Sequence, residues 1–122
     1  MVNVYLCDDV PELRKLLRIV LEEDPDLRVV GEAGDAETGI EEIAELQPDV
    51  VLLDLSMPGL DGLEALPLIR RAAPETSVIV FSGFTEARMG ALVLERGAAR
   101  YIEKGEPLEE VRRAVRELTL GD

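Results

Sequence analysis

The stretch VVLLDLSMPGLDG, residues 50–62, runs consecutive apolar residues directly into the carboxylate Asp54. An uninterrupted apolar run of this kind is typical of a short strand that is covered on both faces of a sheet. The proline and glycines that follow predict a sharp turn immediately after the strand. A carboxylate at the edge of a core is costly unless a partner compensates its charge, so the rest of the sequence should supply that partner.

Apolar runs and amphipathic stretches alternate along the whole chain. Strands are predicted at residues 2–8, 27–33, 49–54, 77–82 and 99–103. The spacing of apolar residues predicts a helix after each strand. The residues expected on these helix faces are Leu13, Leu16, Leu17, Val20 and Leu21, then Ile40, Ile43 and Gln47, then Leu63, Leu66, Ile69, Arg70 and Ala73, then residues 86–96, and finally Leu108, Val111, Val115 and Leu118. This alternation predicts an α/β fold, a doubly wound five-stranded parallel sheet with helices on both faces.

Prolines and one acidic residue mark the expected helix boundaries. Pro11 and Pro107 stand at the start of the first and last helices, and Asp35 is the expected N-cap of the second. Pro67 lies inside the third helix, where it removes one backbone hydrogen bond. We therefore expect a kink or a shortened helix at Pro67.

The composition fits one domain that covers residues 1–122. Hydrophobic residues make up 47% of the chain and aromatic residues only 3%, so the expected core is aliphatic. The formal net charge of −13 repels phosphate groups, so we expect no direct binding to nucleic acid or to an anionic membrane surface. No apolar run approaches the ~20 residues of a membrane-spanning helix, and the first residues lack a signal-peptide pattern.

Cysteine and histidine usage narrow the possible chemistry. The single cysteine, Cys7, cannot form an intramolecular disulfide, which suits the reducing environment of the cytoplasm. We expect its side chain in the core. The sequence has no histidine, which excludes Ser-His-Asp catalysis, Cys-His catalysis and histidine-ligated metal sites.

Polar side chains follow the predicted strands where each strand ends. Asp8 and Asp9 end the first strand, Asp54 the third and Ser82 the fourth, and Lys104 follows the fifth. Ligands of an open parallel sheet bind outside the carboxyl ends of the strands. The sequence therefore predicts that three carboxylates, a hydroxyl and an amine converge on one edge of the sheet.

This group of side chains suits phosphoryl chemistry. The three carboxylates would repel one another unless a cation lay between them, and Mg²⁺ prefers oxygen ligands of this kind. Lys104 is one of only two lysines among 13 basic residues, and a lysine provides a compact point charge. Asp54 could act as a nucleophile toward phosphorus, with Ser82 and the backbone N–H of Gly83 near the phosphoryl oxygens.

Each of these residues also has a structural explanation when taken alone. Asp8 or Asp9 could cap the helix that follows, and Asp54 could be a turn residue. Lys104 could pair on the surface with Glu103 or Glu106, which would contribute little stability. The functional interpretation rests on all of the residues converging on one edge of the sheet.

Segments along the whole chain resemble the receiver domain of bacterial two-component response regulators. They are CDDVPELRKLLRIVLEEDPDLRVVGEAGD, PDVVLLDLSMPGLDGLEAL, VIVFSGF and GAARYIEKG, in this order. Within the first two segments, PDLRVVGEAGD and LDLSMPGLDG are similar to the corresponding sequences of receivers that precede LuxR-type DNA-binding domains, the NarL-like group. The resemblance implies a flavodoxin-like fold with strand order 2-1-3-4-5.

The resemblance also implies a role for each site residue. Asp54 is the expected phosphoacceptor, and Lys104 is expected to contact the phosphoryl group. Mg²⁺ is the implied cofactor, with Asp9 as a direct ligand and Asp8 as a ligand through water. Asp54 itself and the backbone carbonyl of Ser56 are expected to complete the protein ligands.

The same resemblance implies a conformational switch and its partners. Ser82 is the expected switch hydroxyl, and Tyr101 is the aromatic side chain expected to move inward with it. A sensor histidine kinase is the implied phosphodonor, and a homodimer could form through the fourth helix, fifth strand and fifth helix. Gly105 follows Lys104 where many receivers have proline, so the sequence leaves the isomer of the Lys104–Gly105 peptide bond open.

Three other functions remain alternatives. A haloacid-dehalogenase-like phosphatase needs an aspartate two residues after its nucleophile, and this chain has Ser56 there. The chain could instead be a receiver cut from a DNA-binding transcription regulator, in which case the site would be the same. A scaffold that uses no phosphate is disfavoured by the complete acidic cluster. We expect a switch that modifies only itself, and no enzyme that turns over a free substrate.

Overall fold

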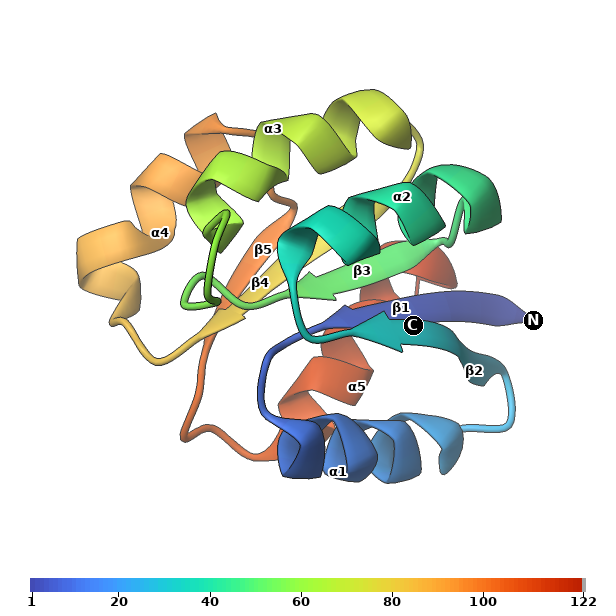
Figure 1. Ribbon diagram of the computed structural model, residues 1–122. Helices are drawn as coiled ribbons and strands as arrows, with labels where there is room; N and C mark the ends of the chain where they lie inside the picture. The colour runs from blue at the N-terminus through green and yellow to red at the C-terminus, as the bar shows by residue number, and fades with distance from the viewer. Residues whose placement is uncertain (122) are drawn as a thin grey trace.

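The protein is a single parallel sheet with helices on both faces (Figure 1). The computed structural model describes residues 1–121 of the 122-residue chain. The elements are β1 (Val2–Cys7), α1 (Pro11–Glu22), β2 (Leu27–Ala33), α2 (Ala36–Leu46), β3 (Val50–Leu53), α3 (Gly62–Ala72), β4 (Ser77–Ser82), α4 (Glu86–Glu95), β5 (Arg100–Glu103) and α5 (Leu108–Thr119). The five strands lie in the order β2-β1-β3-β4-β5 and pair in parallel. The predicted fold class and strand order are confirmed.

Two aliphatic cores lie on opposite faces of the sheet. Alternate strand residues such as Val51 and Val80 belong to the core under α2, α3 and α4. Their neighbours Leu52 and Ile79 belong to the second core, which α1 and α5 cover. Because both faces are buried, the strands need no polar residue before they end. This explains the uninterrupted apolar run that precedes Asp54.

The register of the strands brings their carboxyl ends to a common edge. Cys7 at the end of β1 pairs with Leu53 at the end of β3, and Asp54 N–H donates to the Cys7 carbonyl over 2.9 Å. In β4, Ser82 pairs with Glu103 of β5. The polar residues at and directly after these strand ends therefore lie along the same edge of the sheet.

Three residues test the predicted ends and faces of the helices. Asp35 caps α2 as predicted, because its side chain accepts the Thr38 N–H. Leu16 was expected on the buried face of α1, and this prediction is wrong, because Leu16 is 51% exposed. Gln47 was expected on the face of α2, but it follows the helix with a left-handed φ of 46°, and its side chain binds the Ala72 carbonyl at 3.0 Å.

Helix α3 continues through Pro67 to Ala72, so the helix is not cut short at the proline. Pro67 has no N–H to donate to the carbonyl of Leu63, four residues earlier. The Arg96 guanidinium, just after α4, donates to that carbonyl over 3.5 Å. The residue that follows α4 therefore supplies the hydrogen bond that the proline removes from α3.

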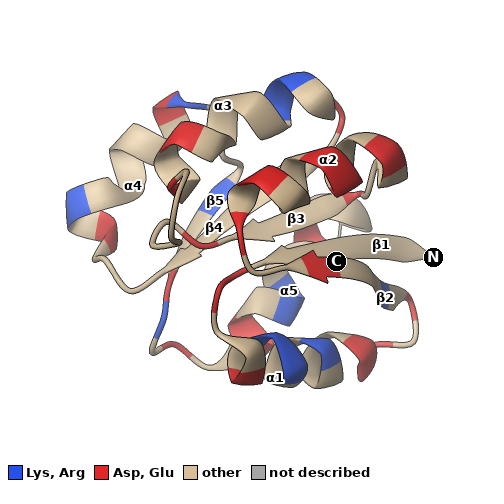
Figure 2. Cartoon of the chain, in the orientation of Figure 1, with Lys and Arg blue, Asp and Glu red and all other residues tan. Residues whose placement is uncertain are grey.

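Charge is unevenly distributed over the fold (Figure 2). No lysine or arginine occurs between residues 29 and 69, and the charged residues of α2 are all acidic. Helices α1 and α5 carry arginines that form ion pairs, such as Arg112 with Glu23 at 2.6 Å and Arg116 with Asp24 at 2.8 Å. Across residues 1–121, none of the helices has the length and apolar character needed to cross a membrane.

Gly62 allows the first turn of α3 to lie against the backbone that carries Asp54. A Cβ atom at Gly62 would lie 2.1 Å from the Asp54 carbonyl oxygen and 2.7 Å from Leu55 Cα. We expect Gly62→Ala to lower the free energy of unfolding by about 3 kcal/mol, because the backbone must move to relieve the overlap. A urea titration followed by circular dichroism measures this change.

Gly83→Ala is the matched control for this substitution. Gly83 has nothing within 4 Å of an added Cβ, so the free energy of unfolding should change by no more than about 0.5 kcal/mol. Equal effects at Gly62 and Gly83 would contradict the packing argument.

Candidate functional site

Three carboxylates meet at the carboxyl edge of the sheet. Asp8, Asp9 and Asp54 each offer one carboxylate oxygen, and these oxygens all lie within 4.8 Å of one another. Asp8 is 4% exposed and Asp54 is 3% exposed, whereas Asp9 faces solvent. The acidic cluster expected from the strand ends is therefore present.

The Lys104 ammonium lies between the two buried carboxylates. Its Nζ atom is 2.9 Å from Asp8 Oδ2 and 3.4 Å from Asp54 Oδ2. Burial lowers the pKa of Lys104, but the hydrogen bond and charge of Asp8 and the charge of Asp54 outweigh it, and the net pKa is raised. Lys104 is therefore a cation at neutral pH. The alternative of a surface pair with Glu103 or Glu106 is wrong.

Asp54 is held in a tight loop at the end of β3. Burial raises the pKa of its carboxyl above the ordinary value, the hydrogen bond from the Ser56 N–H lowers it, and the charge of Asp8 raises it again. The Ser56 N–H lies 3.1 Å from Asp54 Oδ1. The other oxygen of the carboxylate, Asp54 Oδ2, pairs with the Lys104 ammonium.

Asp8 is fixed by partners on both carboxylate oxygens. Its Oδ1 accepts the Val10 N–H over 2.9 Å, and its Oδ2 binds Lys104. The residue that caps α1 is Val10, which makes no side-chain cap. Neither Asp8 nor Asp9 is the N-cap of α1, so the capping alternative is wrong.

Ser82 and Tyr101 meet beside the loop that follows β4. Ser82 is fully buried, and its Oγ accepts the Phe84 N–H over 3.2 Å. The Tyr101 hydroxyl donates to the Phe84 carbonyl over 2.5 Å, and the Tyr101 side chain is largely buried. Burial raises the pKa of the Tyr101 phenol, which a hydrogen bond with Ser82 lowers in part. Both side chains therefore hold Phe84, one through its N–H and the other through its carbonyl.

The backbone after Lys104 bends without a cis peptide. No cis peptide bond occurs in residues 1–121, so the Lys104–Gly105 bond is trans. Gly105 has a φ of 117°, which glycine adopts readily and other residues rarely do. The positive φ of Gly105 therefore allows a turn directly after Lys104 without a cis peptide bond.

The acidic cluster fits a hard divalent cation. Its donors are all carboxylate oxygens, and the exposed Asp9 leaves one side of the cluster open to solvent. Mg²⁺ binds few protein carboxylates and retains several waters, and a site open on one side allows such coordination. Lys104 alone offers one positive charge to three carboxylates, so the cluster has net negative charge for a cation to neutralise.

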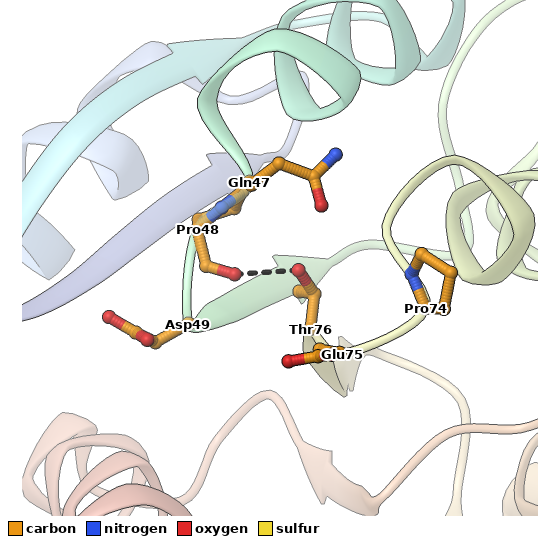
Figure 3. A pocket seen from close by; sticks show the side chains of 6 residues that line it. All are labelled: Gln47, Pro48, Asp49, Pro74, Glu75 and Thr76. Atoms are coloured by element: carbon orange, nitrogen blue, oxygen red, sulfur yellow. Dashed lines mark hydrogen bonds between the residues drawn. The ribbon is translucent and has the colours of Figure 1, made fainter.

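A separate pocket lies at the opposite edge of the sheet (Figure 3). Its volume is about 320 Å³, and it is lined by Gln47, Pro48, Asp49, Pro74, Glu75 and Thr76. Thr76 Oγ1 donates to the Pro48 carbonyl over 2.6 Å and joins the segments that precede β3 and β4. None of the cluster residues lines this pocket.

Sequence reasoning missed the contribution of β2 and α1 to this edge of the sheet. The Arg14 guanidinium donates to the Asp8 carbonyl over 2.6 Å, and its Nε lies 3.6 Å from Glu32 Oε2. Glu32 belongs to the end of β2, which contributes no predicted site residue. The sequence does contain a signal for this contact. Arg14 lies in the first turn of the helix that begins at Pro11, close in the chain to the end of the first strand.

The raised pKa of Asp54 predicts how the Asp54→Asn variant will behave. Because the folded protein binds this proton more tightly than the unfolded chain, wild-type stability falls as the pH rises through the folded pKa. Without divalent cations, we expect Asp54→Asn to have the higher free energy of unfolding at neutral pH. The difference should shrink as the pH falls and Asp54 of the wild type becomes protonated. Urea titrations from mildly acidic to neutral pH measure this difference in the free energy of unfolding. A lower free energy of unfolding for Asp54→Asn than for the wild type at neutral pH would contradict the prediction.

Removing the Lys104 cation should expose the repulsion between Asp8 and Asp54. Breaking a fully buried pair costs several kcal/mol, and since the Lys104 side chain is 24% exposed we expect Lys104→Met to cost about 2 kcal/mol. Lys15→Met, at an exposed position of α1, is the control and should be nearly neutral. Thermal unfolding without divalent cations compares the two, and equal losses would mean that Lys104 does not stabilise the cluster.

Comparison with known proteins places this site in a family. The family model described as the response regulator receiver domain matches residues 4–116. The transcriptional regulatory protein LiaR of Bacillus subtilis is 38% identical over 122 residues, which is 100% of this chain and 58% of that protein. The nitrate/nitrite response regulator protein NarL of Escherichia coli is 37% identical over 120 residues, 98% of this chain and 56% of that protein.

Solved structures agree with the sequence matches. A two-component response regulator of the LuxR family from Aurantimonas superposes with a TM-score of 0.91 at 30% identity and covers 98% of this chain and 85% of that one. The chain spans between 56% and 58% of the length of the two curated relatives. The chain therefore belongs to the response regulator receiver domain family of two-component systems, with relatives in the LuxR and NarL group.

Proposed function

We propose that residues 1–122 form a single receiver domain that works as a phosphorylation switch, in which Asp54 accepts a phosphoryl group in a Mg²⁺-dependent reaction. The observation that supports this most strongly is the Lys104 ammonium, 2.9 Å from Asp8 and 3.4 Å from the buried Asp54. A lysine that served only stability would not need a third carboxylate, that of Asp9, beside the two that it contacts. Such an excess of acid at a sheet edge is suited to holding cations and a phosphoryl group together.

The transfer itself needs a nucleophile that is ionised and directed outward. Burial raises the pKa of Asp54, and the Ser56 N–H and the Lys104 ammonium both act against that rise and favour the ionised carboxylate. A carboxylate oxygen of Asp54 attacks the phosphorus of the donor, and the bond from phosphorus to the donor's leaving group breaks. The leaving group keeps that electron pair, and Asp54 becomes an acyl phosphate. Lys104 then pairs with the new phosphoryl oxygens.

The remaining acidic residues would hold the metal ion. We assign Asp9 as a direct ligand, Asp8 as a ligand through water, and Asp54 and the backbone carbonyl of Ser56 as the other protein ligands. When bound, Mg²⁺ supplies positive charge that stabilises the phosphoryl oxygens during transfer. The donor set of carboxylate oxygens and the open side at Asp9 support this assignment.

Ser82 and Tyr101 would convert phosphorylation into a change of shape. A phosphoryl group on Asp54 offers acceptor oxygens that compete for the Ser82 hydroxyl. Moving Ser82 removes the acceptor of the Phe84 N–H, so the loop that Tyr101 also holds through the Phe84 carbonyl must rearrange. The phosphoryl group then shifts the balance between two arrangements of the β4–α4 loop and Tyr101.

The donor and the output are proposed by analogy with the family. A sensor histidine kinase in the cytoplasm is the proposed phosphodonor, and the face of α4, β5 and α5 is the proposed surface for a homodimer. LiaR is named a transcriptional regulatory protein, and we infer that this receiver likewise controls a separate output function. The domain modifies only itself, since Ser56 occupies the position where an aspartate-nucleophile phosphatase needs its general acid.

Phosphorylation with a small donor tests the acceptor directly. We expect incubation with acetyl phosphate and Mg²⁺ to add the mass of one phosphoryl group to the wild type, and nothing to Asp54→Asn. Intact-protein mass spectrometry measures the gain, and omission of Mg²⁺ should abolish it. Asp61→Asn removes a carboxylate that caps α3 through Glu64, and it serves as the control that retains the gain.

Two outcomes would contradict the proposal. Phosphorylation of Asp54→Asn would place the acceptor elsewhere. A folded wild type that gains no phosphate from acetyl phosphate or from a histidine kinase would mean that the acidic cluster is structural.

A further inference from the structure

We propose that Arg14 is a positioning residue that fixes the Asp8–Asp9 backbone, so that Asp9 is directed into the acidic cluster before a metal ion binds. This inference rests on the proposed function of the cluster. It assigns a task to a residue of α1 that lies outside the acids, the lysine and the switch residues. Arg14 touches neither phosphate nor metal in this proposal and acts only through the backbone.

The Arg14 guanidinium joins two strand ends. Its Nη1 donates to the Asp8 carbonyl over 2.6 Å, and its Nε lies 3.6 Å from Glu32 Oε2 on β2. The Nε atom is buried without a hydrogen-bond partner, so the contact with Glu32 is an ion pair. A single side chain on α1 therefore holds the end of β1 to the end of β2.

The Asp8 carbonyl needs such a partner because of where β1 ends. The strand stops at Cys7, although the Asp8 N–H still donates to the Ala33 carbonyl over 3.0 Å. Beyond that bond the sheet offers no donor to the Asp8 carbonyl, and Arg14 provides one. Both peptide groups of Asp8 are thus held, the one before it through the Asp8 N–H and the one that leads into Asp9 through the Asp8 carbonyl.

Asp9 depends on this backbone more than the other two acids do. Asp8 and Asp54 have side-chain partners in Val10, Lys104 and Ser56. Within residues 1–121, no hydrogen bond or ion pair holds the exposed Asp9 carboxylate. The backbone of Asp9, which sets the direction of its Cα–Cβ bond, is therefore the part of the structure that places this carboxylate. Outer partners that orient a ligand typically change metal affinity by tenfold or more when removed.

Gly34 leaves the space that this arrangement occupies. A Cβ atom at Gly34 would lie 3.3 Å from Arg14 Nη1 and 3.9 Å from Asp9 Cα. The loop after β2 can therefore approach the Asp8–Asp9 backbone closely with Arg14 packed between. A larger residue at Gly34 would have to displace the guanidinium or the loop.

Arg18 provides a natural control, because it shares Glu32 with Arg14. Its Nη2 lies 3.9 Å from Glu32 Oε2, and its Nη1 donates to the Val29 carbonyl over 3.2 Å. Arg18 makes no contact with Asp8 or Asp9. The pair of arginines therefore allows the loss of the Asp8 contact to be separated from the loss of positive charge near the cluster.

Two double variants with unchanged net charge test the proposal. Arg14→Gln with Glu32→Gln removes the contact to the Asp8 carbonyl, and Arg18→Gln with Glu32→Gln retains it. We expect the dissociation constant for Mg²⁺, measured by isothermal titration calorimetry on the unphosphorylated protein, to rise about tenfold in the first variant. It should rise no more than about twofold in the second. The midpoint of thermal unfolding without metal should be similar in both.

Arg14→Lys adds a variant that keeps the charge and the fold. Lysine can reach one of the two partners but not both, so its dissociation constant should lie between those of the wild type and the Arg14→Gln double variant. Equal weakening in the two double variants, or none in either, would overturn the proposal. A wild type that binds no Mg²⁺ would overturn the proposed function, whereas a wild type that binds Mg²⁺ with unchanged affinity in Arg14 variants would overturn only this inference.

Discussion

The ion pair between Lys104 and the two buried carboxylates is the interaction on which the functional edge of this protein depends. Asp8 and Asp54 leave water because the sheet places them directly after fully buried strands. Their mutual repulsion would oppose folding, and the Lys104 ammonium, which reaches both carboxylates from the end of the edge strand β5, reduces it. The same geometry keeps the carboxylate oxygens close together, which is the condition for holding a cation. The same side chains therefore determine both the stability of this edge of the sheet and its capacity to bind a cation.

Much of this arrangement could be predicted because parallel strands with short apolar runs have few arrangements. Val50 to Leu53 has no polar residue to place in water, so both faces of its strand must be covered. Once the sheet is parallel, residues that follow its strands must share an edge, and Asp54, Asp8 and Lys104 are then near neighbours. The order of the strands came from resemblance to receiver domains rather than from these patterns.

The features that the sequence did not predict depend on contacts between elements. Leu16 fits the helical period of α1 at the edge of its apolar stripe, but it lies in solvent while Leu17 and Leu21, which are four residues apart, are buried. Arg14 and Glu32 resemble any solvated pair until β2 is placed beside β1. Periodicity describes one element at a time, so it identifies residues that point inward and overlooks side chains that join two elements.

The hydrogen bond from Arg96 to the Leu63 carbonyl has a consequence for how this structure opens. Because Pro67 cannot satisfy that carbonyl, its protein donor is Arg96, at the end of α4. A thermal fluctuation that detaches α4 also leaves α3 with a carbonyl that has lost its protein donor, so the opening free energies of the two helices are linked. Amide hydrogen exchange reports local opening of this kind. Since α3 begins at Gly62, against the backbone of Asp54, the link runs from the end of α4 to the helix that packs on the acidic edge.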